Sequence, residues 1–326
     1  MNKELAVNRL QAVKRFVKSL VFLQGFLYGL VLLLVAANSY AFDVVIIKSA
    51  NIAPYNEAER GFRSEVSARI RTVLIDRPLE EEYLTLNKRL REHPADLLFV
   101  IGERALVLSK PFINKVPIVF SYVFDPEKTL GGDVSTLTSV AGVRMTIPPE
   151  KQILAFKEAM PSLKSIGIVY DPKKTQPLVE RAHAEAKLHG IEVVSRPVVS
   201  PKGVVDAVES FKDEVGAILM LPDTTVINAA TVRYLLLFSF RQKIPLFGLS
   251  EKHVKKGAFL GLAFENEAMG VQAGRLAMNM TKVGAAFDVV IEEPEALDLI
   301  LNVKTVRKLN VQVRESFIEK VDVEYD

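Results

Sequence analysis

Polar and aromatic side chains recur directly after short apolar runs that are typical of buried β-strands. Helix N-termini at such positions offer free backbone N–H groups to a carboxylate, whereas Asp and Glu side chains suit an ammonium group. Asp223 and Ser121 are the preferred candidates, although several others also fit turn or N-cap sequences. The candidate ligand-binding residues are Asn51, Gly102, Glu103, Ser121, Tyr122, Asp125, Tyr170, Asp223, Thr224, Ser250, Phe264 and Glu265.

The motifs of common enzyme classes are missing from the sequence. It has no Gly-x-Gly-x-x-Gly, no phosphate-binding loop, no Gly-x-Ser-x-Gly and no His-Glu-x-x-His. There is no Cys, and the four His include His183 and His189, which are too far apart to pair on one helix face. His253 follows Glu251 in a basic stretch that we expect to be a solvated loop. The sequence therefore predicts a protein that is not an enzyme and that uses no cofactor and no metal.

The first 41 residues form a leader with a positive flank and an apolar core. Residues 19–37 are uncharged and follow Lys14, Arg15 and Lys18, and small residues at Ser39 and Ala41 fit a cleavage site before Phe42. Cleavage is the preferred interpretation, while an uncleaved membrane anchor stays open because about 20 apolar residues can span a bilayer. Either way we expect residues after the leader to be exported to the periplasm, tethered to the inner membrane if the leader is retained.

The remainder of the chain alternates β-rich apolar runs with longer helical patterns, which is typical of parallel βαβ units. We expect strands at 43–48, 70–75, 96–101, 117–122 and 140–143, and a second series at 165–170, 192–195, 217–221, 245–249 and 258–264. A helix at 265–282, a strand-like run at 288–291, a strand at 297–302 and a helical tail follow. The similar order of the two series predicts an α/β protein with two doubly wound lobes whose strand ends face a common cleft.

Domain boundaries follow from this pattern. We expect 42–145 with about 265–286 to form the first lobe, and 146–264 with about 287–326 to form the second. Outside the leader the chain holds 37 basic and 38 acidic residues, so the overall charge of +3 comes from the leader. Nucleic-acid binding is therefore not expected, because it requires a basic folded surface.

Several stretches in order along the chain resemble one family, the exported solute-binding proteins of ABC uptake systems, whose best-known members bind aromatic amino acids. The matching stretches include Val116-Pro-Ile-Val-Phe-Ser121, Met160-Pro-Ser-Leu-Lys-Ser-Ile-Gly-Ile-Val-Tyr170, Leu221-Pro-Asp-Thr-Thr-Val226 and Asn302-Val-Lys-Thr-Val-Arg-Lys-Leu309. The resemblance implies a type I periplasmic-binding fold with three hinge crossovers. It also implies a monomer that closes on a small-molecule ligand and delivers it to a membrane permease.

Departures from the family pattern bear on the ligand. Glu103 stands where the family usually has a Thr, and Tyr122 follows Ser121 where a small residue is usual. Because Glu103 would repel a carboxylate, a cationic or neutral polar ligand is the hypothesis that follows. Two alternatives stay open at this point: a periplasmic sensor that passes its signal to a receptor kinase, and, less favoured, an exported hydrolase.

Overall fold

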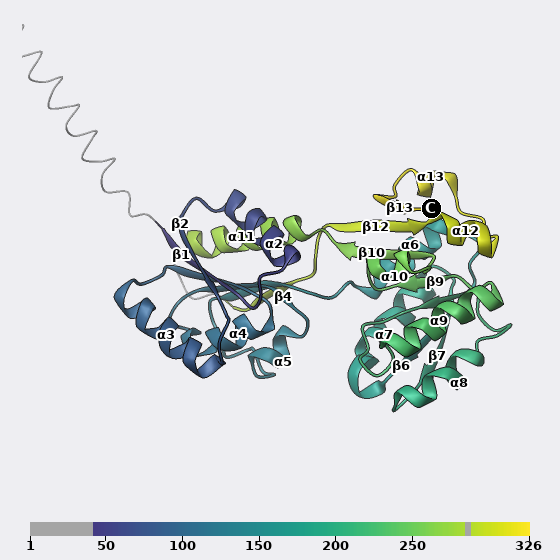
Figure 1. Cartoon of the computed structure of the whole chain (residues 1–326), viewed down its shortest axis with the longest axis horizontal. Coiled ribbons are helices and arrows are strands. Elements are labelled where there is room, and N and C mark those ends of the chain that lie inside the picture. Colours follow the sequence, from purple (N-terminus) through teal and green to yellow (C-terminus); the bar gives the residue numbers. More distant parts are fainter. Residues whose placement is uncertain (1–41, 284–287) are drawn as a thin grey trace, which may run out of the picture. The chain divides into compact units, whose positions relative to one another are not determined.

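The computed structural model describes residues 42–283 and 288–326, which form two sheets flanked by helices (Figure 1). The expected leader, residues 1–41, lies outside the described residues. In the part of the chain that is described, no helix has both the length and the apolar character needed to cross a membrane.

The first sheet has six parallel strands in the order β2–β1–β3–β4–β5–β11. Figure 1 shows α2 and α11 on one face of this sheet and α3, α4 and α5 on the other. The central strands of the sheet are buried because both of its faces are covered. The strands are β1 (Asp43–Lys48), β2 (Arg69–Leu74), β3 (Leu97–Ile101), β4 (Ile118–Val123), β5 (Val140–Arg144) and β11 (Val290–Glu292). The helices are α2 (Ala53–Glu65), α3 (Leu79–Glu92), α4 (Glu103–Ser109), the short η1 (Lys110–Phe112), α5 (Pro126–Leu130) and α11 (Asn266–Val283).

The second sheet has seven strands in the order β7–β6–β8–β9–β10–β12–β13, and only the β10–β12 pair is antiparallel. One apolar core packs α6 and α7 against this sheet, and another packs α8, α9 and α10 against it. The strands are β6 (Ser165–Tyr170), β7 (Glu192–Pro197), β8 (Ala217–Leu219), β9 (Leu246–Gly248), β10 (Leu260–Phe264), β12 (Leu297–Asn302) and β13 (Val323–Tyr325). The helices are α6 (Pro149–Ala159), α7 (Pro172–Leu188), the short η2 (Pro201–Gly203), α8 (Val204–Glu209), α9 (Ala229–Gln242), α10 (Glu251–Lys255), α12 (Val303–Leu309) and α13 (Glu315–Ile318).

The chain passes between the two sheets three times. The first crossing joins β5 to α6, the second joins β10 to α11, and the third joins β11 to β12. This confirms the predicted α/β fold with two mostly parallel sheets connected by three segments. Because β11 pairs with β5, the third crossing follows Glu292, later than the boundary expected near residue 287. The division into lobes otherwise stays a prediction.

Glycines bring α2 and α11 into close contact over the first sheet. A Cβ atom added at Gly61 would lie 1.9 Å from the backbone oxygen of Glu267, and one at Gly270 would lie 1.9 Å from that of Ala58. Both helices bury apolar residues, and Phe62 of α2 stacks on Phe99 of the underlying strand β3 at a centroid distance of 4.1 Å. This contact fixes the start of α11, directly after the second crossing, against α2.

Short elements account for the main differences from the expected pattern. The prediction that His253 lies in a solvated loop is wrong, because Glu251–Lys255 form α10 and the half-buried His253 ring accepts a hydrogen bond at Nδ1 from the Leu249 amide at 3.2 Å. The helix α5 and the strand β13 were also not expected. The expected strands at 165–170 and 297–302 match β6 and β12 residue for residue.

Candidate functional site

An aromatic residue with a left-handed backbone stands at the end of β4. Tyr122 has φ = 60°, and the pairing of β4 with β5 shifts register between Ser121 and Val123. A bulky residue with positive φ is strained, and such strain and such bulges concentrate at functional sites, where they redirect a side chain. The backbone around Tyr122 is therefore the strongest indication of a site in the described part of the chain.

The Tyr122 ring lies between two other rings, and we call Tyr55, Tyr122 and Phe264 the aromatic set. The centroid distances are 5.2 Å from Tyr122 to Tyr55 and 6.5 Å from Tyr122 to Phe264, with the rings tilted by 60° and 66°. Tyr55 comes from α2, whereas Phe264 is the last residue of β10. The aromatic set thus joins the first sheet to the second crossing.

Polar contacts surround the aromatic set. The Tyr122 hydroxyl donates to Oδ1 of Asn266, and Nδ2 of Asn266 donates to Oε2 of Glu57 at 2.7 Å. Burial, with Glu57, Glu265 and Tyr55 nearby, raises the pKa of Tyr122 above its ordinary value. Burial and then Glu103 raise the pKa of Tyr55. Both phenols therefore stay protonated at neutral pH, and the Tyr122 hydroxyl, whose hydrogen goes to Asn266, can still accept a hydrogen bond.

Gly102 allows a close approach beside Tyr55. It has φ = 93°, and a Cβ atom there would lie 2.6 Å from Oγ of Ser49 and 2.7 Å from the Tyr55 hydroxyl. Ser49 also accepts the amide hydrogen of Ala105 at 2.9 Å and so caps the α4 N-terminus. Glu103 begins α4, is exposed and accepts a hydrogen bond from Thr129 at 3.3 Å.

Ser121 is fully buried, and its hydroxyl has no hydrogen-bond partner among the described residues. Its backbone oxygen accepts the Gly102 amide hydrogen at 2.9 Å, so it is held beside the N-terminus of α4. Burying a hydroxyl without a partner costs about 1–3 kcal/mol. Ser121, which the sequence already indicated, therefore stays a strong candidate for a contact with the ligand.

Asp223 has a structural role in the second sheet. Its Oδ2 accepts from the Asp171 amide at 2.7 Å and from the Thr175 hydroxyl at 2.6 Å. Its Oδ1 accepts from the amides of Thr225 at 2.8 Å and Val226 at 3.2 Å. Because all four donors lie within the protein and Asp223 is 1 % exposed, its carboxylate is already occupied in this structure.

The other predicted residues lie in varied surroundings. Phe264 and Glu265 adjoin Tyr122, and the Glu265 carboxylate accepts the amides of Glu267 and Ala268 as a cap of α11. Asp125 is the N-cap of α5 and Ser250 that of α10, while Asn51 is exposed and accepts from Asn56. Tyr170 is buried in the core of the second sheet, and Thr224 is exposed and accepts from Lys174 at 2.6 Å.

The structure thus brings Tyr122, Phe264 and Glu265 together. Gly102 and Glu103 lie near Tyr55, whose ring packs on that of Tyr122. The described contacts do not join Tyr170, Asp223 or Thr224 to this group. Four residues near it were not predicted: Ser49, Tyr55, Glu57 and Asn266. Two of the four carried a signal in the sequence, since Ser49 directly follows β1 and Asn266 directly follows the second crossing.

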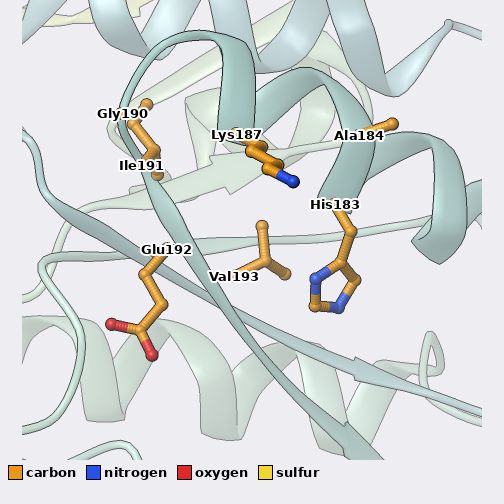
Figure 2. Close-up of a pocket in the computed structure, with 7 residues that line it drawn as sticks. All are labelled: His183, Ala184, Lys187, Gly190, Ile191, Glu192 and Val193. Carbon is orange, nitrogen blue, oxygen red and sulfur yellow. The ribbon is translucent and has the colours of Figure 1, made fainter.

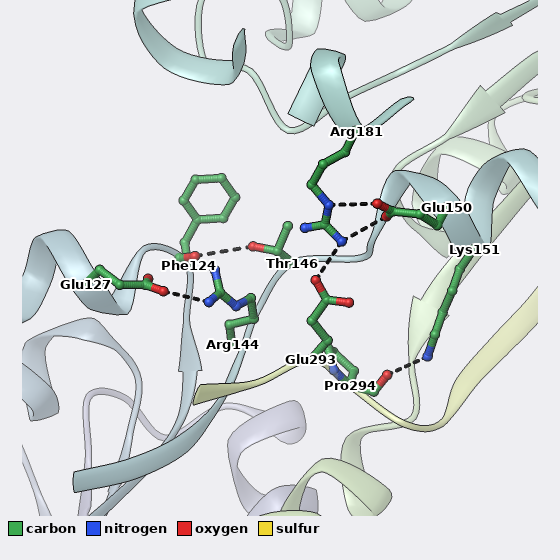
Figure 3. Close-up of polar contacts among 9 residues, drawn as sticks. All are labelled: Phe124, Glu127, Arg144, Thr146, Glu150, Lys151, Arg181, Glu293 and Pro294. Atoms are coloured by element: carbon green, nitrogen blue, oxygen red, sulfur yellow. Dashed lines mark hydrogen bonds and ion pairs between the residues drawn. The ribbon is translucent and has the colours of Figure 1, made fainter. Parts of the chain in front are cut away.

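Ion pairs and hydrogen bonds surround the third crossing (Figure 3). Arg181 of α7 makes a bidentate contact with Glu150 and also contacts Glu293, all at 2.8 Å. Hydrogen bonding to Glu150, and then to Glu293, outweighs the effect of burial and raises the pKa of Arg181. Lys151 donates to the Pro294 backbone oxygen at 2.6 Å. These contacts hold residues of the third crossing against α6 and α7.

Gln272 holds the same segment from α11. Its side chain is 3 % exposed and donates to Glu292 Oε2 at 2.8 Å and to the Glu293 backbone oxygen at 3.0 Å. It also accepts the Glu295 amide hydrogen at 3.1 Å. The third crossing is therefore held by side chains of both sheets' helices.

A separate, shallow surface pocket of about 580 Å³ lies between the end of α7 and the edge strand β7 (Figure 2). Its lining includes His183, Lys187 and Glu192, and it contains none of the predicted site residues. Among residues 42–283 and 288–326, no group of three or more His, Asp and Glu side chains is arranged to hold a metal ion.

Comparison with known proteins identifies the class. The model of the family described as ABC transporter substrate binding protein matches residues 79–323, which is most of the chain, so the chain belongs to this family. The predicted resemblance to ABC solute-binding proteins is thereby confirmed. The family is one of substrate-binding proteins, and that this chain is not an enzyme stays a prediction.

Particular relatives are distant. A tyrosine-binding protein of Clostridioides difficile is 22% identical over 223 residues, which cover 67% of this chain and 64% of that protein. A ligand-free, open substrate binding protein with adhesive properties from Clostridium difficile has a TM-score of 0.70 at 17% identity, covering 87% of this chain and 99% of that one. A Streptococcus ABC domain in complex with L-Trp has a TM-score of 0.56 at 19% identity, with the same coverage. These likenesses confirm the periplasmic-binding type of fold.

Proposed function

We propose that this chain is the exported solute-binding component of an ABC-type uptake system, which captures a small polar or aromatic solute and delivers it to a membrane permease. The observation that carries the proposal is the aromatic set, with Tyr122 strained at a bulge and Phe264 at the second crossing. A ligand that contacts both would interact with the first sheet and with a segment leading to the second. Such a ligand favours one arrangement of a two-state hinge.

The chemistry of the site supports an aromatic ligand, and Glu57, Glu103 and Glu265 near the aromatic set favour one that is neutral or cationic overall. Tyr55 and Tyr122 offer ring faces and hydroxyl groups, and the buried Ser121 hydroxyl is available as a further donor or acceptor. The relatives support the same class, since one is a tyrosine-binding protein and another was crystallised with L-Trp.

Thermal unfolding of the full chain in the presence of candidate solutes tests this proposal. The set should include tyrosine, tryptophan, nucleosides, purines and small organic ions. A bound solute at about 100 times its Kd should add about 2.7 kcal/mol to the free energy of unfolding. Failure of every compound to raise the melting temperature would count against solute binding.

Tyr122→Phe tests whether the aromatic set is the binding site. The change removes the hydroxyl that contacts Asn266 and keeps the ring, so the affinity for the solute should fall several-fold. Tyr83→Phe is the matched control, because Tyr83 packs on Phe112 at 5.8 Å away from the aromatic set. Equal affinities for the two variants would place the binding site elsewhere.

Export and hinge closure are further parts of the proposal. Mass spectrometry of the protein from periplasmic extracts should show a chain that begins at Phe42, or an intact chain in the membrane fraction if the leader is retained. Small-angle scattering should show compaction when the solute is added. Recovery only from the cytosol, or no change in scattering with a bound solute, would contradict these parts.

A further inference from the structure

A groove of about 620 Å³ lies between α9 and α10 on the second sheet. The buried side chains of Val232 and Leu236 contribute apolar surface to it, and Leu237 at its edge is 60 % exposed. Phe240 also lines the groove, and its ring packs so closely on Gly257 that a Cβ atom there would lie 2.9 Å away. The groove is therefore apolar and well defined on the α9 side.

Three cationic side chains line this groove and no acidic one does. They are Arg233 on α9 and Lys252 and Lys256 on α10 or at its end, and all three are exposed. Within residues 42–283 and 288–326, none of them forms an ion pair. Lys252 and Lys256 are four residues apart, a spacing at which like charges on a helix repel each other.

His253 also lines the groove, and both burial and the positive charges around it act on its pKa. It lies between the two lysines, and burial, followed by Lys256 and Lys252, lowers the pKa of its imidazole. Lys308 lies 5.6 Å from the centre of the Phe240 ring and adds another positive charge nearby. An anion in the groove would pair with these charges.

We propose that the groove binds a small organic anion with an apolar body, such as an aromatic or short-chain carboxylate or sulfonate. The volume lies within the range of about 300–1,000 Å³ that is usual for small-molecule sites. The groove combines apolar side chains with three cationic ones, which suits a small molecule that has an apolar body and an anionic group.

This second site is independent of the proposed transport function. None of the twelve residues predicted for the solute site lines the groove. The groove lies on the α9 and α10 side of the second sheet, whereas the aromatic set involves α2, β4 and the end of β10. A ligand here would add a second binding event to the chain.

Anilinonaphthalene sulfonate is a suitable probe, because it joins aromatic rings to one anionic group and fluoresces more strongly in an apolar site. Its neutral counterpart, phenylnaphthylamine, serves as the charge control. The apolar leader residues 19–37 are present in every variant, so any binding to them cancels in the comparison. We expect a saturable component of sulfonate binding that depends on the groove lysines and weakens as salt is added.

Lys252→Gln with Lys256→Gln should weaken binding of the sulfonate about tenfold without lowering the melting temperature, because the two like charges repel each other. The control pair is Lys202→Gln with Lys255→Gln, which removes the same charge from exposed positions outside the groove and should bind as the wild type does. The NMR signals of His253, one of only four His, should move when the sulfonate is added to the wild type.

Three results would overturn the proposal. They are equal affinity of the sulfonate for both double variants, equal affinity of the wild type for the neutral amine, and His253 signals that stay in place at saturation. If a Leu237 variant weakened binding of the sulfonate and of the neutral amine equally, the groove would instead be a contact surface for another apolar surface. None of these results affects the solute site, whose test uses different ligands and Tyr122.

Discussion

Replacing Asp223 with Ala should destabilise the second sheet and leave the solute site intact. The carboxylate accepts four hydrogen bonds at 2.6–3.2 Å and is 1 % exposed, so the substitution strands two donors on each oxygen. Leaving one buried donor without an acceptor costs about 1–3 kcal/mol. Because the four donors share one cavity and water can relieve some of them, we expect a total loss of about 3–5 kcal/mol.

Two further variants calibrate this prediction. Asp223→Asn keeps one acceptor oxygen and should lose about half as much stability. Asp125→Ala is the matched control, because Asp125 is exposed and caps the short α5 through the Lys128 amide at 3.1 Å. Loss of such a cap should cost about 1 kcal/mol.

Urea unfolding of the full chain measures the three losses, and solute titration of the folded variants measures affinity. The expected order of destabilisation is Asp223→Ala, then Asp223→Asn, then Asp125→Ala, with solute affinity near that of the wild type in each. If Asp223→Ala unfolded within about 1 kcal/mol of the wild type but no longer bound the solute, the carboxylate would be a ligand contact and the reasoning would be refuted.

Three other substitutions test the packing, the third crossing and the titration of α10. Gly61→Ala should lower the free energy of unfolding by about 3 kcal/mol or more, because the added Cβ atom meets backbone on α11. Gln272→Ala should cost about 1–2 kcal/mol, because the buried Gln272 side chain loses its hydrogen bonds to the third crossing. The pKa of His253 in the folded chain lies below its ordinary value of 6.5, so the unfolded chain takes up a proton more readily than the folded chain. The free energy of unfolding of the wild type should therefore fall as the pH drops below about 6.5. His253→Gln should reduce that fall.

Controls for these predictions come from exposed positions of the same residue type. Gly190→Ala meets no atoms within 4 Å and should cost only about 1 kcal/mol, from its positive φ. Gln176→Ala, on the exposed side of α7, should have almost no effect. Thermal melts between pH 7 and pH 5 follow the pH profile of unfolding for the wild type and for His253→Gln. Equal effects within any pair would contradict the corresponding argument.

The regular elements were predictable because their patterns are local. The strands β6 and β12 appear as apolar runs of the right length, and turn or cap residues mark their ends. The helix α10 and the strand β13 are too short to leave a periodic pattern, and they depend on distant partners. Val323 of β13 pairs with Ile300, and the hydroxyl of Tyr325 donates to Glu251 of α10.

The candidate site was predictable in part. Strand ends pointed to Tyr122 and Phe264, but the same rule favoured Asp223, whose carboxylate the structure shows to be occupied by four protein donors. A polar residue after a strand has the same appearance in the sequence whether it organises a turn or contacts a ligand. Only the count of its donors separates the two roles, and those donors lie up to 52 residues away.

The conformation of Tyr122 shows why the rest could not be read from the chain. Local preference at a position with φ = 60° favours Gly or Asn, and a Tyr there costs about 1–3 kcal/mol. The strain persists because the ring packs between Tyr55 and Phe264 and the hydroxyl bonds to Asn266, 144 residues further along. A contact network of that span exists only after both sheets have formed, so the residue that violates its local rule is the one we expect the ligand to use.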